Sequence, residues 1–260
     1  MENEQWWIGG GDRDSTFSTT PLLHPEPAKL IVLEGIDLSG RTTQVHLLRD
    51  WLTAQHYQVT TTAWRTSPLI SDVLARARTK LPLRPLTYSL LYCADHLDRT
   101  ERVIKPALER GEIVLADRYT YTAFARDEAR RLDKVWVRNL YCFTVKPDVV
   151  FYLHINPEEA VRRRVALQQQ RARVVEEKPK KQSEKKQKKV QRSERSATTI
   201  QLPSLTPEAM ESFHDFEMKM YSQYQSMQKE FDFVVIEGSQ SIDLVQATLR
   251  RAVMRLLLEL

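Results

Sequence analysis

Short apolar runs alternate with amphipathic segments along most of this chain. Five runs are predicted to be strands, and most of them are rich in apolar residues, as is typical of strands that helices cover on both faces. They occupy residues 30–33, 57–63, 113–116, 148–155 and 231–236. Because strands alternate with helical segments and no hairpin turn joins them, the pattern predicts an α/β fold with one parallel sheet and helices on both faces.

The segments between these runs have apolar residues at helical spacing. Val45, Leu48 and Leu52 illustrate the pattern, and Phe213, Phe216, Met220 and Tyr224 repeat it near the end. A helix also begins at Asn156 or Pro157, since proline suits a first turn. We expect helices over 42–55, 71–79, 86–110, 120–131, 134–145 and 207–230, and a closing helix to residue 260.

Composition predicts one folded domain preceded by a tail. Residues 1–27 are polar and rich in glycine and proline, so we interpret them as an N-terminal extension, and 28–260 as a single domain. No apolar run is long enough to span a membrane, and the start does not resemble a secretion signal. Cys93 and Cys142 lack metal-ligand spacing, so we expect two core thiols and a cytoplasmic location.

The positive charge belongs to one segment. Residues 162–195 carry 14 Lys and Arg against four Asp and Glu, whereas the rest of the chain carries 25 against 30. The tract over 178–206 has too little apolar surface to fold alone and is expected to be a disordered insertion. Nucleic acid is therefore not an expected partner, except through this basic tract.

The most informative stretch is GIDLSGRTTQ, which follows the first apolar run and Glu34. A strand, a loop with Gly35 and Gly40, and a helix form the context of the phosphate-binding motif GxxxxGK[ST]. Thr42 fits the motif, but Arg41 replaces its lysine, and an arginine is bulkier and has a planar donor fork. The alternative is a strand-to-helix turn with incidental glycines.

Two further strand ends carry charged residues. Arg65 follows the second strand in WRTSP, and Asp117 and Arg118 end the third in GEIVLADRY. The carboxyl ends of parallel strands meet at one edge of a sheet, where a carboxylate can meet magnesium and arginines can hold phosphates. The alternatives are a solvated loop charge for Arg65 and a helix N-cap for Asp117.

A polar stripe, made of Tyr92, Asp95, His96 and Arg99, lies on one face of the expected 86–110 helix. Such a face either overlooks a pocket or is solvated.

Taken together, the motifs resemble the thymidylate kinase family. The resemblance rests on the ordered set VLEGIDLSGRTTQ, LLYCADH, IKPALERGEIVLADRY, PDVVFYLHINPEEAVRR, the 216–224 helix and IEGSQSI. It implies a P-loop NTPase sheet of order 2-3-1-4-5 with a basic lid insertion at about 162–206. It also implies transfer of the ATP γ-phosphoryl group to dTMP with Mg²⁺, giving dTDP, and a homodimer in which Leu91, Tyr141 and Phe143 contribute to helix packing.

The resemblance also assigns roles to residues. The ATP phosphates would lie against Gly35, Ile36, Asp37, Leu38, Ser39, Gly40, Arg41, Thr42 and Thr43, and adenine against Gly238, Ser239 and Gln240. Thr42 and Asp117 would hold Mg²⁺, while Asp37, Arg65, Asp95, His96, Arg118 and Thr122 would contact the acceptor. Arg162, Arg163 and Arg164 would belong to the lid, and Arg41, Asp117, Arg118 and Asp37 would act in catalysis.

Several positions depart from the family pattern. Besides Arg41, His96 replaces an arginine of the thymine pocket, His154 replaces an aspartate, and Thr122, Ala125, Arg126 and Asp127 stand where Ser, Ala, Tyr and Gln are usual. These changes affect base recognition more than phosphate handling. Two alternatives are a nucleotide-binding protein with weak or no turnover and a kinase for another nucleoside monophosphate.

Overall fold

The computed structural model describes residues 28–79, 83–176 and 206–258. Its centre is one sheet of five parallel strands in the order β2-β3-β1-β4-β5. The strands are β1 (Lys29–Glu34), β2 (Val59–Ala63), β3 (Ile113–Asp117), β4 (Val149–His154) and β5 (Val234–Glu237). The predicted α/β class and strand order are confirmed.

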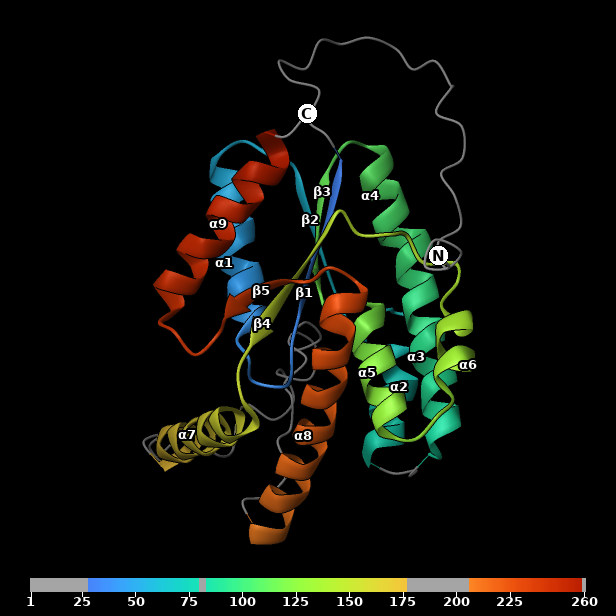
Figure 1. The fold of residues 1–260 in the computed structure, drawn as a ribbon, viewed down its shortest axis with the longest axis vertical. Helices are drawn as coiled ribbons and strands as arrows, with labels where there is room; N and C mark the ends of the chain where they lie inside the picture. The colour runs from blue at the N-terminus through green and yellow to red at the C-terminus, as the bar shows by residue number, and fades with distance from the viewer. Residues whose placement is uncertain (1–27, 80–82, 177–205, 259–260) are drawn as a thin grey trace, which may run out of the picture.

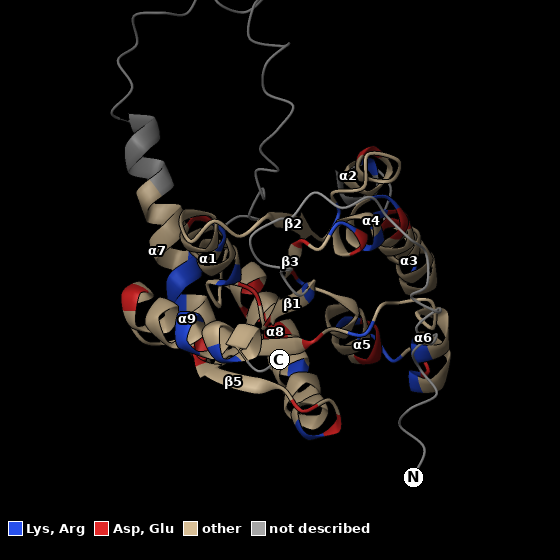
Figure 2. Cartoon of the chain, turned by 90° about the horizontal axis from the view of Figure 1, so that it is seen from above, with Lys and Arg blue, Asp and Glu red and all other residues tan. Residues whose placement is uncertain are grey.

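Helices cover both faces of this sheet (Figure 1). They are α1 (Arg41–Ala54), α2 (Ser71–Thr79), α3 (Pro85–Arg99), α4 (Lys105–Glu109), α5 (Thr120–Ala129), α6 (Lys134–Leu140), α7 (Pro157–Glu176), α8 (Pro207–Glu230) and α9 (Ile242–Leu258). Helices α1 and α9 lie on one side, and α3, α4, α5, α6 and α8 on the other. Helix α7 projects from the body in both views (Figures 1 and 2).

The apolar run of β1 supplies both cores, because successive side chains of a strand point to opposite faces. Leu30 and Val32 belong to the larger cluster, under α3, α5 and α8. Ile31 and Leu33 belong to the cluster under α1 and α9. All four side chains are fully buried, which fixes β1 in the middle of the domain.

The prediction of one continuous helix over 86–110 is wrong in the middle of that range. A π-helical turn, Thr100–Ile104, separates α3 from α4. Pro106 stands at the start of α4 and has no N–H to donate to the carbonyl one turn earlier. The π-turn accommodates this break without ending the helical path.

Other element ends differ because of local backbone features. Helix α5 stops at Ala129 and is followed by Arg131 at a φ of 66°. The N-cap Asp133 starts α6 by accepting a hydrogen bond from the Trp136 amide at 2.7 Å, and α6 ends at Leu140 rather than 145. Strand β5 begins only at Val234, because Asp232 has a φ of 49°.

The two cysteines occupy different environments. Cys93 is buried, and burial raises its pKa to about 12. Cys142 is exposed in the turn after α6, so the prediction of two core thiols is wrong for Cys142.

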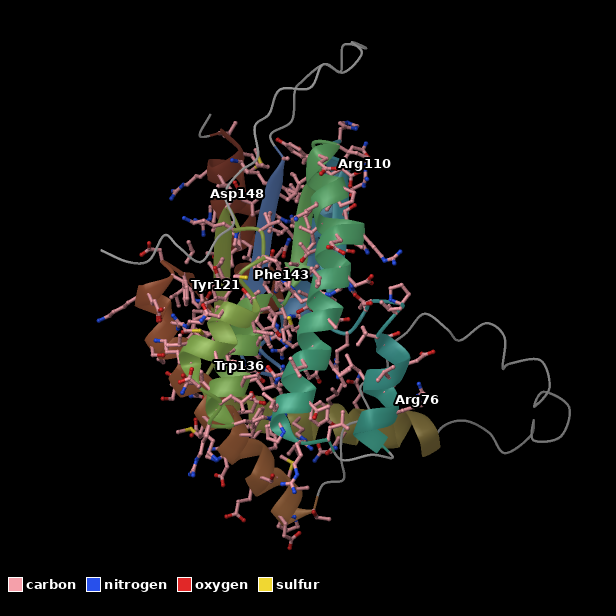
Figure 3. The ribbon with its side chains drawn as sticks, turned by 90° about the vertical axis from the view of Figure 1, so that its right-hand side faces the viewer. Arg76, Arg110, Tyr121, Trp136, Phe143 and Asp148 are labelled. Carbon is pink, nitrogen blue, oxygen red and sulfur yellow. The ribbon has the colours of Figure 1, made fainter. Side chains whose placement is uncertain are left out.

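Aromatic side chains fill the space between α5, α8 and the sheet. Tyr121 packs edge-on against Phe231 and Phe233, with ring centroids 5.0 and 4.9 Å away. Phe143 belongs to a neighbouring group with His96 and Tyr141. Figure 3 labels Tyr121 and Phe143 inside the molecule, while Arg76 and Arg110 project from the surface. Tyr141 is buried here, so the prediction that it contributes to a dimer surface is wrong.

Three sequence predictions concern residues outside the described ranges: the 1–27 extension, the disordered tract over 178–206 except Thr206, and nucleic-acid binding through that basic tract. None of the described helices is long and apolar enough to cross a membrane.

Candidate active site

The carboxyl ends of all five strands bring most of the predicted site residues to one edge of the sheet. Strand β3 lies between β1 and β2. Asp117, at the end of β3, is paired with Leu33 of β1 on one side and with Ala63 of β2 on the other. The loop after β1, the Asp117–Arg118 pair and Arg65 are therefore neighbours. Helix α7 and Gly238 follow β4 and β5 at the same edge.

The loop after β1 has a backbone that only glycine suits at two positions. Gly35 has a φ of 149°, and a Cβ there would lie 2.7 Å from the carbonyl oxygen of Leu153. Gly40 has a φ of 99° and is the N-cap of α1. The loop thus leads directly into a helix N-terminus, where backbone N–H groups attract an anion, and it has the geometry of a P-loop.

Arg41 is buried beneath this loop. Its Nη1 donates to the carbonyl of Gly35, to that of Ile36 at 2.6 Å and to the Ser39 hydroxyl at 3.0 Å. Its Nε lies 3.2 Å from Oδ1 of Asp117. The guanidinium therefore uses its planar donor fork to fix the loop and to join it to β3.

Thr42 and Asp117 form a pair of oxygen groups at the start of α1. The Thr42 hydroxyl donates to Oδ2 of Asp117, the oxygen that Arg41 leaves unused. A hydroxyl and a carboxylate are the donor types that Mg²⁺ prefers, so this pair fits the predicted metal site. Among the described residues, no group of three or more His, Cys, Asp or Glu could hold a metal ion on its own.

Arg118 lies between the loop and α5. It forms an ion pair with Asp37 and donates to the Thr122 hydroxyl at 3.1 Å. Asp37 is exposed, whereas Arg118 is mostly buried. The structure therefore brings three predicted acceptor residues, Asp37, Arg118 and Thr122, together.

Asp95 and His96 do not join this group, although we predicted acceptor contacts for both. Both are fully buried. Asp95 accepts hydrogen bonds from the backbone amides of Arg65 and Ser67, each at 3.0 Å, and so shapes the loop that carries Arg65. His96 packs edge-on against Tyr119, and burial lowers its pKa well below the usual value.

Arg126 occupies the space between two aromatic rings. Its Cζ lies 3.7 Å from the ring centroid of Tyr92 and 4.7 Å from that of Trp64. Asp127 pairs with Arg126 and accepts a hydrogen bond from the hydroxyl of Ser89. The departure from the family pattern at Arg126 therefore places a guanidinium between the rings of Trp64 and Tyr92.

The three predicted lid arginines differ in their surroundings. Arg163 donates to the carbonyls of Leu38 and Gly238, at 3.1 and 2.8 Å, and pairs with Glu159. Arg162 is exposed and pairs with Glu159, and Arg164 is buried with its Cζ 4.2 Å from the Phe213 ring centroid. Arg163 thus links the P-loop to the Gly238 loop, where Ser239 and Gln240 are exposed.

Two carboxylates and a tyrosine in the site were not predicted. Glu34 is fully buried and accepts hydrogen bonds from the Tyr119 amide, from Thr122 and from the Tyr224 hydroxyl. Glu217, on α8, accepts a hydrogen bond from the backbone amide of Asp37 at 2.9 Å. The sequence offered one signal for Glu34, because this charged residue ends the apolar run of β1. No local pattern marks Glu217, because its role depends on the packing of α8 against the loop.

The fold and this arrangement define a protein of the P-loop class. The sequence profile named thymidylate kinase matches residues 33–206, and the chain belongs to the thymidylate kinase family.

Curated relatives agree with this assignment. "Probable thymidylate kinase 2" of Saccharolobus solfataricus is 44% identical over 134 residues, which are 52% of this chain and 62% of that protein. "Probable thymidylate kinase" of Thermococcus kodakarensis is 35% identical over 142 residues, 51% of this chain and 69% of that protein. A protein of the same name from Halobacterium salinarum is 35% identical over 141 residues, 52% of this chain and 69% of that protein.

Proposed function

We propose that this protein transfers the γ-phosphoryl group of ATP to dTMP, giving dTDP and ADP. An oxygen of the dTMP phosphate forms the new bond to the γ-phosphorus, and the bond from that phosphorus to the β–γ bridging oxygen breaks. The observation that carries the proposal is the junction of Arg41, Thr42 and Asp117 beneath a P-loop at the sheet edge. Positioning and charge stabilisation are the main requirements of phosphoryl transfer.

The donor triphosphate is proposed to lie along the loop from Gly35 to Thr43. Its negative charge would be stabilised by the loop amides and the N-terminus of α1. Thr42 and Asp117 would hold Mg²⁺, which neutralises phosphate charge when bound. Arg163 would keep the P-loop and the Gly238 loop at a fixed separation around the donor, because it is bonded to both.

The acceptor phosphate is proposed to lie near Arg118 and Arg65. Asp37 and Thr122 hold the Arg118 guanidinium in place, and Asp95 holds the Arg65 loop through backbone amides. Fixing the Arg118 guanidinium and the backbone at Arg65 before the substrate arrives lowers the cost of orienting the acceptor in line with the donor.

The test is ADP and nucleoside diphosphate formation with ATP and Mg²⁺ across a panel of nucleoside monophosphates. We expect dTMP to be the preferred acceptor. A nucleotide-binding protein without turnover would bind ATP but form no dTDP, and a kinase for another acceptor would prefer a different member of the panel.

We further propose that the protein acts as a cytoplasmic homodimer. Leu86, Leu90 and Leu97 are exposed along α3, at 49, 48 and 37%, and such a stripe is suited to helix packing. Sedimentation of the wild-type chain and of Leu90→Glu tests this: a dimer that becomes a monomer supports the proposal, and a wild-type monomer contradicts it.

A further inference from the structure

The loop after β5 is anchored at its first residue, Gly238. The Gly238 amide donates to the carbonyl of His154 at 2.8 Å, and the Gly238 carbonyl accepts a hydrogen bond from Nη2 of Arg163 at 2.8 Å. A Cβ at Gly238 would lie 3.0 Å from Cγ2 of Ile155, so this residue packs closely against the end of β4. Ser239, the next residue, is exposed, and its position depends on contacts of its own.

Glu237 holds Ser239 through one carboxylate oxygen. Its Oε1 accepts the Ser239 amide at 3.1 Å and the Ser239 hydroxyl at 2.7 Å. The Ser239 hydroxyl first, and then the Ser239 amide and the His154 ring, lower the pKa of Glu237, so this group is ionised at neutral pH. Its side chain is 48% exposed at the end of an edge strand, where other rotamers are accessible. The position of Ser239 therefore depends on what keeps Glu237 in this orientation.

The His154 ring restrains Glu237. The register of β4 and β5 pairs the two residues, so their side chains lie on the same face of the sheet. Nδ1 of His154 lies 3.5 Å from Oε2 of Glu237, the oxygen that Ser239 leaves unused. Because a carboxylate only accepts, the proton belongs on Nδ1, and Nε2 can accept a hydrogen bond from a hydroxyl. The hydroxyl of Tyr221, on α8, lies 3.1 Å from Nε2, so the ring is held from both sides.

Helix α8 is a firm support for Tyr221 because it is anchored before and after this residue. Glu217, one turn before Tyr221, accepts a hydrogen bond from the Asp37 amide. Tyr224, three residues after Tyr221, is fully buried and donates to Glu34 at 2.7 Å. The orientation of His154 is therefore fixed by a helix that is itself bonded to the P-loop and to β1.

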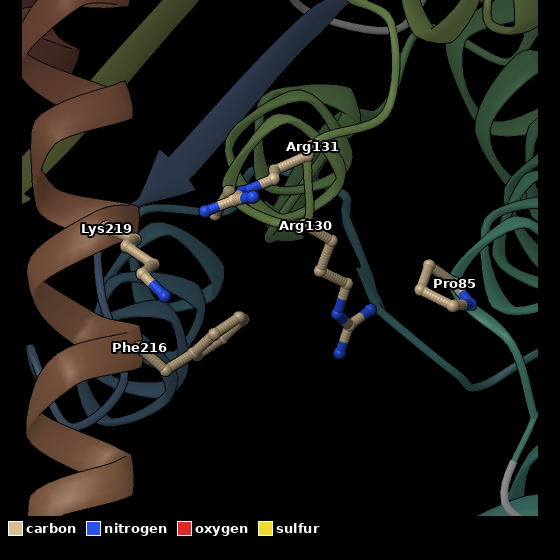
Figure 4. A pocket seen from close by; sticks show the side chains of 6 residues that line it. Pro85, Arg130, Arg131, Phe216 and Lys219 are labelled. Atoms are coloured by element: carbon tan, nitrogen blue, oxygen red, sulfur yellow. The ribbon is translucent and has the colours of Figure 1, made fainter.

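The same helix borders the acceptor side of the site. Phe216 and Lys219, which flank Glu217, line a cavity of about 470 Å³ together with Arg130, and Figure 4 shows both side chains pointing from α8 toward that arginine. The contact between Tyr221 and His154 extends the support of α8 to the donor side. One helix thus holds both sides of the site.

We infer that His154 is a positioning residue for the donor nucleotide, because it links α8 to Glu237 and so fixes Ser239. The inference rests on the donor half of the proposed function, in which adenine lies against Gly238, Ser239 and Gln240. His154 stands where the family pattern has an aspartate. An aspartate facing Glu237 would repel its charge, whereas the imidazole donates to it, so this link is a feature of the present chain.

The experiment is calorimetric titration of the full chain in Mg²⁺ with two probes, a non-hydrolysable ATP analogue and inorganic triphosphate. Both offer phosphates to the P-loop, but only the nucleotide reaches Ser239. His154→Gln places an amide near the position of Nε2, so it keeps the contact with Tyr221 and loses that with Glu237. His154→Asn places an amide near Nδ1 and does the reverse. The matched control is His46→Asn, which removes an exposed imidazole from α1.

We expect His154→Gln to bind the ATP analogue about fivefold more weakly or worse, and to bind inorganic triphosphate as the wild type does. His154→Asn should recover most of the lost affinity, and the control should match the wild type with both probes. Triphosphate binding that falls by the same factor as nucleotide binding would overturn the inference, because the P-loop itself would then be disturbed. Wild-type nucleotide binding in His154→Gln, or equal losses in His154→Gln and His154→Asn, would also overturn it.

A product assay on the same preparations separates this inference from the proposed function. A selective loss of nucleotide binding in His154→Gln, with no dTDP formed by the wild type, would support the positioning role and contradict phosphorylation of dTMP. Formation of dTDP with unchanged nucleotide binding in His154→Gln would support the proposed function and contradict the positioning role.

Discussion

Arg41 and Asp117 form the ion pair that joins the P-loop to the neighbouring strand, with Nε of the arginine 3.2 Å from Oδ1 of the aspartate. The same carboxylate accepts the Thr42 hydroxyl through its other oxygen. An arginine in place of the motif lysine therefore has a defined structural role. It holds the carbonyls of the loop and orients the acid that we propose as a ligand of Mg²⁺.

Changing Arg41 tests this role. Arg41→Lys should reduce kcat about tenfold, because one ammonium cannot reach both Asp117 and the loop carbonyls at once. Arg41→Ala should reduce it about a hundredfold or more, since buried acceptors then lose charged donors. Initial rates of ADP release with ATP and dTMP measure both effects.

Arg49→Lys, further along the same helix and 41% exposed, is the matched control and should leave the rate unchanged. Wild-type rates in Arg41→Lys would mean that the specific contacts of the guanidinium are unimportant. Wild-type rates in Arg41→Ala would contradict the role altogether.

Asp117→Asn should raise the Mg²⁺ concentration needed for half-maximal rate and reduce kcat by about a hundredfold. The amide keeps the size of the side chain but loses the charge that attracts the metal and pairs with Arg41. A Mg²⁺ titration of the rate measures the effect. An unchanged Mg²⁺ concentration for half-maximal rate would show that Asp117 does not help to bind the metal.

Arg163→Ala should raise the KM for ATP about fivefold or more and leave the KM for dTMP unchanged, because two charge-assisted bonds between the donor loops disappear. Arg162→Ala is the neighbouring control: its side chain is 71% exposed and pairs with Glu159, so its KM values should match the wild type. Equal KM values for ATP in the two variants would show that the link between the loops does not support donor binding.

Titration of Glu217 should make the free energy of unfolding depend on pH. Burial first, and then the charge of Asp37, raise its pKa from 4.5 to about 8. The folded state thus binds the proton more tightly than the unfolded chain, so this group's contribution to the free energy of unfolding is greatest below pH 4.5 and falls as pH rises toward 8. Acidic conditions protonate Glu217 and so remove the free-energy cost of burying its negative charge.

Glu217→Gln keeps an oxygen for the Asp37 amide and removes the titration. At pH 8 the variant should be more stable than the wild type by roughly 4 kcal/mol, and at pH 5 the difference should fall to roughly 1 kcal/mol. Urea unfolding at the two pH values measures this. A variant less stable than the wild type by the same amount at both pH values would contradict the raised pKa.

The sequence allowed the P-loop to be predicted because its signals are local. The apolar run ending at Leu33, the glycines at 35 and 40 and the helical spacing after Thr42 lie within a short stretch of chain. The Asp117–Arg118 position followed from the same rule of strand ends. These residues needed only the prediction of a parallel sheet to be placed together.

The other site features depend on contacts between distant elements, which periodicity does not reveal. The polar stripe on α3 proved to be buried, because the chain after α6 brings Tyr141 and Phe143 against His96. The position of Arg126 depends on Trp64 and Tyr92, which come from two other segments. Spacing along one helix cannot show what covers that helix.

The most direct test of the central claim is a product assay with purified protein, ATP, Mg²⁺ and dTMP. We predict stoichiometric formation of dTDP and ADP, lost when Mg²⁺ is removed by a chelator. ATP binding without any dTDP, at protein concentrations that would reveal even slow turnover, would contradict the assignment of this site to phosphoryl transfer onto dTMP.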